Sequence, residues 1–120
     1  MTYGYTLVST QGQNGGNQKH EILEFANTKG LGRVDFVQEV ISGTISWSNR
    51  ELGGLVKKMV KKDVLIVSEL SRLGRSMLEI MEVLAILLRK KCKVYAVKSD
   101  YELGDNIQSK VLAFAFSLAS

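Results

Sequence analysis

Hydrophobic positions in this chain follow two spacings, and segments with each spacing alternate along the sequence. Short segments rich in β-branched and aromatic residues predict strands. They are Tyr3–Val8, Val34–Ile41, Val64–Val67 and Val94–Val97. Longer segments repeat apolar positions every three or four residues, which predicts amphipathic helices. They cover about 17–29, 49–60 and 77–88.

This alternation predicts an α/β fold with three layers, in which a mostly parallel sheet is flanked by helices. The run Val64–Val67 contains no polar position. Such a run is typical of a strand that is covered on both faces. In sheets of this kind, ligands bind in the loops at the carboxyl ends of the strands, so functional residues are expected there.

A last helix is predicted from Asp105 onward, and it is apolar on more than one side. Its main stripe is Ile107, Val111, Leu112, Ala115 and Leu118, and Phe114 and Phe116 lie outside that stripe. A helix with this pattern must bury more than one side. The core of the chain covers one side only. We therefore expect a second copy to pack on Val111, Phe114, Ala115 and Leu118.

Composition adds limits to this picture. The chain has 120 residues, no proline and one cysteine. This length supports one domain, and a single cysteine excludes an internal disulfide framework and fits a reducing compartment. No apolar run reaches the length of a transmembrane helix, and the amino terminus lacks the pattern of a signal peptide. We expect a cytoplasmic chain with no membrane partner.

The positive charge is concentrated in the middle of the chain. The net charge is +4, yet residues 50–93 hold 11 basic and 5 acidic residues. An excess of this kind fits a polyanionic partner. The alternative is a solvated helix face, which accounts well for Lys57, Lys58, Lys61 and Lys62.

Two helix starts carry the sequence pattern of a capping box. Ser76 is followed by Glu79, and Ser48 by Glu51, so helices are predicted to begin at about 77 and 49. Arginines then lie at or before two helix amino termini, where a cation is unfavourable. They are Arg50, Arg72 and Arg75. Such violations tend to mark functional sites, and a bound anion would reverse the sign. Alternatively, each arginine pairs with a carboxylate or lies in solvent.

Ser9 is the hydroxyl nearest to these arginines, at the end of the first predicted strand. The only histidine, His20, lies inside a helix, and no G-x-S-x-G elbow is present, which argues against a Ser-His-Asp hydrolase. Arginines around a serine instead suit phosphoryl transfer. One His, one Cys and no P-loop motif leave no template for a metal or a nucleotide cofactor. Cys92 is expected to be an inert small residue.

Three motifs together resemble the catalytic domain of serine site-specific recombinases, the resolvases and DNA invertases. They are Tyr5-Thr6-Leu7-Val8-Ser9-Thr10, Ser42-Gly43 and Leu70-Ser71-Arg72-Leu73-Gly74-Arg75-Ser76. The resemblance covers nearly the whole chain. It implies a mixed, mostly parallel sheet flanked by helices. It also implies residues 1–120 as a catalytic domain with a truncated dimerisation helix, and a DNA-binding region outside this chain.

The resemblance implies a role for each matching residue. Ser9 corresponds to the nucleophile that forms a covalent phosphoserine link to double-stranded DNA. Arg72 and Arg75 correspond to the pair that grips the scissile phosphate, and Arg50 to the arginine after the second strand. Supporting polar positions are matched by Gln18, Glu39, Ser42 and Asp63. Family members need no metal and no cofactor, and they form dimers, and tetramers during strand exchange.

Two positions depart from the family pattern. Leu7 stands where an arginine is usual, and Ser71 where many members have Asp. Losing one phosphate donor costs on the order of 3 kcal/mol, or roughly 10²-fold in rate. Leu7 is also at home in an apolar strand. The chain is therefore a weakened member, carries a deliberate substitution, or uses another cation in place of that arginine.

Two other functions compete with a recombinase. One is a degenerate family member that acts as a DNA-associated or dimerisation module, which Leu7 favours and the arginines oppose. The other is a flavodoxin-like domain that binds a small ligand. A receiver domain, by contrast, would need clustered acidic residues after the first strand, which instead leads into Val8-Ser9-Thr10.

Overall fold

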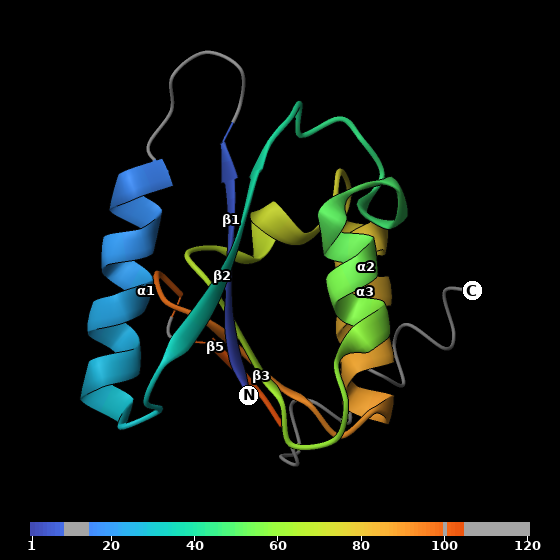
Figure 1. Cartoon of the computed structure of the whole chain (residues 1–120). Helices are drawn as coiled ribbons and strands as arrows, with labels where there is room; N and C mark the ends of the chain where they lie inside the picture. Colours follow the sequence, from blue (N-terminus) through green and yellow to red (C-terminus); the bar gives the residue numbers. More distant parts are fainter. Residues whose placement is uncertain (9–14, 100, 105–120) are drawn as a thin grey trace.

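The computed structural model describes residues 1–8, 15–99 and 101–104 (Figure 1). It forms one five-stranded sheet in the order β2-β1-β3-β4-β5. The strands are β1 (Thr2–Val8), β2 (Val34–Val40), β3 (Val64–Val67), β4 (Lys93–Ala96) and β5 (Tyr101–Leu103). The first four strands are parallel, and β5 runs antiparallel to β4.

Helices cover both faces of this sheet (Figure 1). They are α1 (Gly15–Lys29), α2 (Glu51–Lys58) and α3 (Met77–Arg89), with short 3-10 helices η1 (Trp47–Asn49) and η2 (Leu70–Leu73). The helix α1 lies on one face, and α2 and α3 lie on the other. The predicted three-layer α/β fold with a mostly parallel sheet is confirmed.

Each face of the sheet has its own apolar core. Against α1, Ile22 and Ala26 pack with Ile66 of β3. On the opposite face, Leu65 of β3 packs in a larger cluster that also contains Leu7. All four residues of β3 are buried, as the unbroken apolar run predicted. The sheet is therefore tightly packed on both faces, and the loops that carry the candidate residues leave its carboxyl edge.

Two parts of the fold were not predicted from the hydrophobic pattern. The strand β5 has only three residues, too few for an alternating pattern to stand out. The helix α2 begins at Glu51, two residues later than the capping box at Ser48 predicted. Ser48 lies in η1 and makes no capping hydrogen bond.

The predicted last helix, with Val111, Phe114, Ala115 and Leu118, lies outside the described residues. So does Ser9, the residue that follows β1 in the sequence. None of the helices in the described part of the chain combines the length and the apolar character that crossing a membrane requires.

Candidate active site at the carboxyl edge of the sheet

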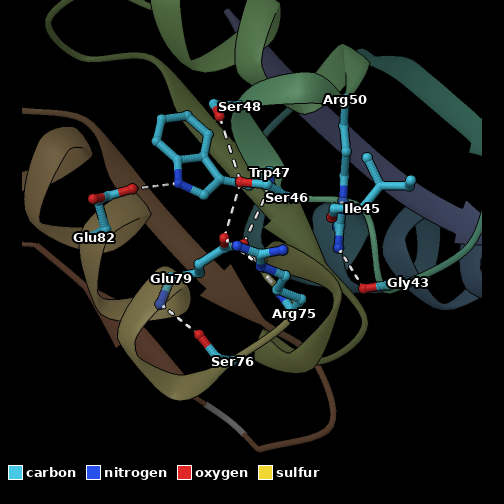
Figure 2. A network of polar contacts seen from close by, with 10 residues as sticks. All are labelled: Gly43, Ile45, Ser46, Trp47, Ser48, Arg50, Arg75, Ser76, Glu79 and Glu82. Atoms are coloured by element: carbon cyan, nitrogen blue, oxygen red, sulfur yellow. Dashed lines mark hydrogen bonds and ion pairs between the residues drawn. The ribbon is translucent and has the colours of Figure 1, made fainter.

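Arg50 joins the loops that follow β2 and β3 at the carboxyl edge of the sheet. Its side chain is 5% exposed. Its Nε donates to the Ile45 carbonyl at 2.9 Å and its Nη2 to the Gly43 carbonyl at 3.1 Å (Figure 2). Its Nη1 donates to the Arg72 carbonyl at 2.7 Å. The buried guanidinium therefore fastens residues 42–50, called the arm below, to η2.

Glu39 of β2 supports the base of the arm from below. Its Oε1 accepts the Tyr5 hydroxyl at 2.7 Å, and its Oε2 accepts the Glu51 backbone N–H at 2.6 Å. The carboxylate thus caps α2, which explains why the helix begins at Glu51 and not at the predicted position. Burial raises the pKa of Tyr5, the hydrogen bond to Glu39 raises it further, and nearby Arg50 opposes this only in part.

Gln18 of α1 holds the end of β1. The pairing of β1 with β3 extends only to Gly4, so the backbone at Leu7 has no strand partner on that side. The Gln18 Oε1 accepts the Leu7 N–H at 3.1 Å, and its Nε2 donates to the Leu7 carbonyl at 2.9 Å. This buried amide fixes the backbone two residues before Ser9.

Arg72 follows β3 and is partly buried. Its Nη2 lies 3.3 Å from the Glu69 Oε2, and the Lys98 Nζ lies 3.7 Å from the same oxygen. The Arg72 Nε is buried and has no hydrogen-bond partner among the described residues. Two cations, Arg72 and Lys98, therefore share the Glu69 carboxylate.

Arg75 stands just before α3, and its side chain is 57% exposed. Its Nε lies 2.9 Å from the Glu79 Oε2, whereas no described residue accepts a hydrogen bond from its Nη atoms. Carboxylate pairing, the alternative explanation for the arginines, is thus confirmed for Arg72 and Arg75. It is wrong for Arg50, which is buried against carbonyl groups.

Glu79 connects the start of α3 to the arm (Figure 2). Besides Arg75, its carboxylate accepts the Ser46 hydroxyl at 2.9 Å and the Trp47 backbone N–H at 3.2 Å. Burial alone would raise the pKa of Glu79, but these hydrogen bonds and the Arg75 charge outweigh it and lower the pKa. Gly74 permits the close approach, since a Cβ there would lie 2.7 Å from the Glu79 Cβ.

The remaining two supporting residues are Ser42 and Asp63. Ser42 opens the arm on the surface, where its Oγ lies 2.8 Å from the Thr44 Oγ1. Asp63 precedes β3 at the opposite edge of the sheet. Its Oδ1 accepts the Met1 α-amino group at 2.9 Å, and its Oδ2 accepts the Val60 N–H at 2.9 Å. Burial opposes these bonds, yet they lower the pKa of Asp63, which anchors the amino terminus.

Candidate metal ligands are sparse. No three or more His, Cys, Asp or Glu side chains within residues 1–8, 15–99 and 101–104 gather into a group that could hold a metal ion. Cys92 is buried, and its Sγ donates to the Val60 carbonyl at 3.2 Å. Burial is the main reason that the pKa of this thiol is raised. The thiol is therefore a poor nucleophile.

The arrangement of a buried arginine, two paired arginines and the end of β1 at one edge can be compared with known proteins. A family model described as "Resolvase, N terminal domain" matches residues 2–120. The chain belongs to this family. A relative named "Resolvase" from Clostridium perfringens (strain 13 / Type A) is 26% identical over 119 residues, which are 98% of this chain. The chain spans 60% of the length of that resolvase.

Two solved structures of other proteins share the fold. The N-terminal catalytic domain of TP901-1 integrase matches with a TM-score of 0.71 and 15% identity, over 98% of this chain and 92% of that one. A resolvase family site-specific recombinase from Streptococcus pneumoniae matches with a TM-score of 0.63 and 16% identity, over 99% and 88%. At these identities the likeness concerns the fold.

Three charged residues of this resolvase-family edge were missed by sequence reasoning. Glu79 was recognised only as half of a capping box, although its carboxylate turns to Arg75 and the arm. Glu69 and Lys98 each come two residues after a strand, β3 and β4. Their position at the carboxyl ends of predicted strands could have marked them as candidate site residues. The pairing of Lys98 with Glu69 across two strand ends has no local sequence pattern.

Proposed function

We propose that this chain is the catalytic domain of a site-specific DNA recombinase with Ser9 as its nucleophile. The Ser9 Oγ would attack a DNA phosphodiester, a deoxyribose oxygen would leave with a proton, and a phosphoserine ester would remain. Attack by a free DNA hydroxyl would then restore the phosphodiester and release the serine. The ester keeps the bond energy, so the cycle needs no added cofactor.

The observation that carries this proposal is the availability of two arginines at the edge where β1 ends. The Arg75 side chain is 57% exposed and none of the described residues accepts a hydrogen bond from its Nη groups, which suits a phosphate because guanidinium donors match phosphate oxygens in pairs. Arg72 stands three residues earlier, with 29% of its side chain exposed. Family membership supports the same chemistry and favours it over a flavodoxin-like domain that binds a small ligand.

We assign Arg50 a different role from Arg72 and Arg75. Its three nitrogens already donate to carbonyl groups, and only 5% of the residue is exposed. It would act as a positioning residue that holds η2, and with it Arg72, in place next to the reacting phosphate.

A weakened recombinase that acts mainly as a DNA-associated module is the second candidate, and Leu7 favours it. Its side chain is 6% exposed and packs in the apolar core on the α2 and α3 face. It supplies no donor where the family pattern has an arginine. Lys98 could supply a positive charge in place of that family arginine, because its ammonium group shares the Glu69 carboxylate with Arg72.

Trapping of a covalent protein–DNA adduct tests the reaction. The full-length protein would be incubated with a pool of nicked duplexes of random sequence, and adducts would be resolved under denaturing conditions. We expect Ser9→Ala to abolish the adduct while the melting temperature stays unchanged. Adduct that persisted in Ser9→Ala would rule out Ser9 as the nucleophile.

The same assay tests Leu7. We expect Leu7→Arg to raise adduct formation by up to about 10²-fold, at some cost in stability because the site is buried. Leu7→Met is the matched control, since it keeps the volume and adds no charge. Equal adduct yields from the unchanged protein and Leu7→Arg would contradict a weakened site.

The partners that follow from this function are double-stranded DNA and a second copy of the chain. We keep Val111, Phe114, Ala115 and Leu118 as the proposed self-association surface, although they lie outside the described residues. Sedimentation of Phe114→Glu would show a lower mass than the unchanged protein. We also propose that choice of the DNA site needs a separate DNA-binding region, since the resolvase relative is longer than this chain.

A further inference from the structure

The Glu79 carboxylate accepts more hydrogen bonds than a helix cap requires. In a capping box the glutamate returns to the backbone N–H of the capping serine. Here Ser76 accepts the Glu79 N–H at 3.2 Å, but the carboxylate reaches one residue further back, to the Arg75 N–H at 3.2 Å. It also accepts the Arg75 Nε. Both halves of Arg75, backbone and side chain, are thus held by one carboxylate.

The contact with Glu79 uses the Nε of Arg75 and leaves its two Nη groups out of the ion pair. Glu79 is only 14% exposed and accepts the Nε, which lies on the inner side of the guanidinium. The two Nη groups, with no acceptor among the described residues, remain on the 57% exposed side chain. Because a guanidinium is planar, fixing the Nε fixes the direction in which the Nη pair points.

Glu79 also binds Arg75 to the arm. The same carboxylate accepts the Ser46 hydroxyl and the Trp47 N–H (Figure 2). One turn further along α3, Glu82 accepts the Trp47 indole Nε1 at 2.6 Å. Two carboxylates of one helix therefore hold the arm, and only Glu79 touches Arg75.

We propose that Glu79 is a positioning residue, which orients Arg75 so that its Nη pair faces a DNA phosphate at the edge of the sheet. This rests on the proposed function of Arg75 as a phosphate ligand. The negative charge of Glu79 opposes phosphate binding and at the same time orders the guanidinium. Orientation serves the reacting geometry, whereas the charge weakens the bound state.

Glu79→Gln separates these two effects, and Glu82→Gln is the matched control. We expect Glu79→Gln to slow adduct formation about tenfold, as loss of an orienting partner does at other sites. Its affinity for a duplex, measured by fluorescence anisotropy, should stay equal or rise about twofold, because a nearby negative charge is gone. Glu82→Gln, which loosens the arm alone, should leave both quantities near those of the unchanged protein.

The proposal is overturned if adduct rate, duplex affinity and melting temperature of Glu79→Gln all fall together, since Glu79 would then serve stability only. It is also overturned if Glu82→Gln and Glu79→Gln behave alike. A direct measurement does not depend on catalysis: the Arg75 Nε–H should give a protected nitrogen–proton NMR signal that Glu79→Gln removes and Glu82→Gln keeps. If the unchanged protein formed no adduct, the recombinase function would fail, and this signal would still decide whether Glu79 holds Arg75.

Discussion

At the start of α3, Ser76 caps the helix from within its own sequence, whereas the start of α2 is capped by Glu39 from a neighbouring strand. Both starts carry the Ser-x-x-Glu pattern. At Ser76 half of the pattern forms, because the Ser76 Oγ accepts the Glu79 N–H while the Glu79 carboxylate accepts the Arg75 N–H. At Ser48 the hydroxyl lies in η1, 3.4 Å from the Ser46 Oγ, and the cap comes from β2.

The arginines at the same two helix starts differ in burial. Arg50 at the start of α2 is buried, and its donors are used by carbonyl groups of the protein. Arg75 before α3 is mostly exposed, and its Nη groups have no acceptor in the described part of the chain. Burial therefore separates two identical side chains: Arg50 holds the loops of the protein together, and Arg75 is the one proposed to bind a phosphate.

Alanine at each arginine gives the largest contrast. We expect Arg50→Ala to lower the free energy of unfolding by about 3 kcal/mol, because it leaves three carbonyl groups without a buried donor. Arg75→Ala should change it by less than about 1 kcal/mol, since its ion pair is exposed. Urea unfolding measures both. Equal losses would show that the two helix starts do not differ as described.

The Glu39 cap is the next test. Glu39→Gln keeps the volume but places a donor or a neutral acceptor where the Tyr5 hydroxyl and the Glu51 N–H both need a carboxylate oxygen. We expect a loss of about 2 kcal/mol in urea unfolding. Glu51→Gln is the control, because it changes an exposed side chain and keeps the backbone N–H. A loss below that of the control would mean that α2 is capped by something else.

The two serines sharpen the comparison at smaller scale. Ser76→Ala should cost about 1 kcal/mol, the usual effect of removing an N-cap side chain. Ser48→Ala should be close to neutral, because its hydroxyl caps nothing. A thermal melt of both variants is sufficient. A Ser48→Ala loss as large as that of Ser76→Ala would restore the helix start predicted from sequence.

The smallest expected effect is in the pH dependence. The pKa of Glu79 is lowered, so its contribution to stability is present above the usual pKa of a glutamate and is lost as pH falls through the lowered value. Glu79→Gln should therefore be less stable near pH 7, with the difference from the unchanged protein shrinking in acid. Urea midpoints from pH 7 to pH 3 give this difference. A difference that does not vary with pH would contradict it.

The hydrophobic pattern was sufficient for most of the fold, because the spacing of apolar residues reflects burial directly. It predicted β3 as a strand covered on both faces. It also predicted the alternation of strands and helices that makes the sheet mostly parallel. It missed the cap by Glu39, which lies 12 residues from Glu51 in sequence. It also could not separate Arg50 from Arg75, since carbonyl and phosphate oxygens attract a guanidinium alike. The distinction depends on burial, which only the packed structure reveals.

The grip of Gln18 on Leu7 has a mechanical consequence. The last part of β1 is attached on one side by a helix side chain in place of a neighbouring strand. Two hydrogen bonds of this kind contribute about 1–3 kcal/mol, well below the stability of a whole domain. A small displacement of α1 would therefore free only one side of the strand end, because Leu7 and Val8 would stay paired with β2 on the other side.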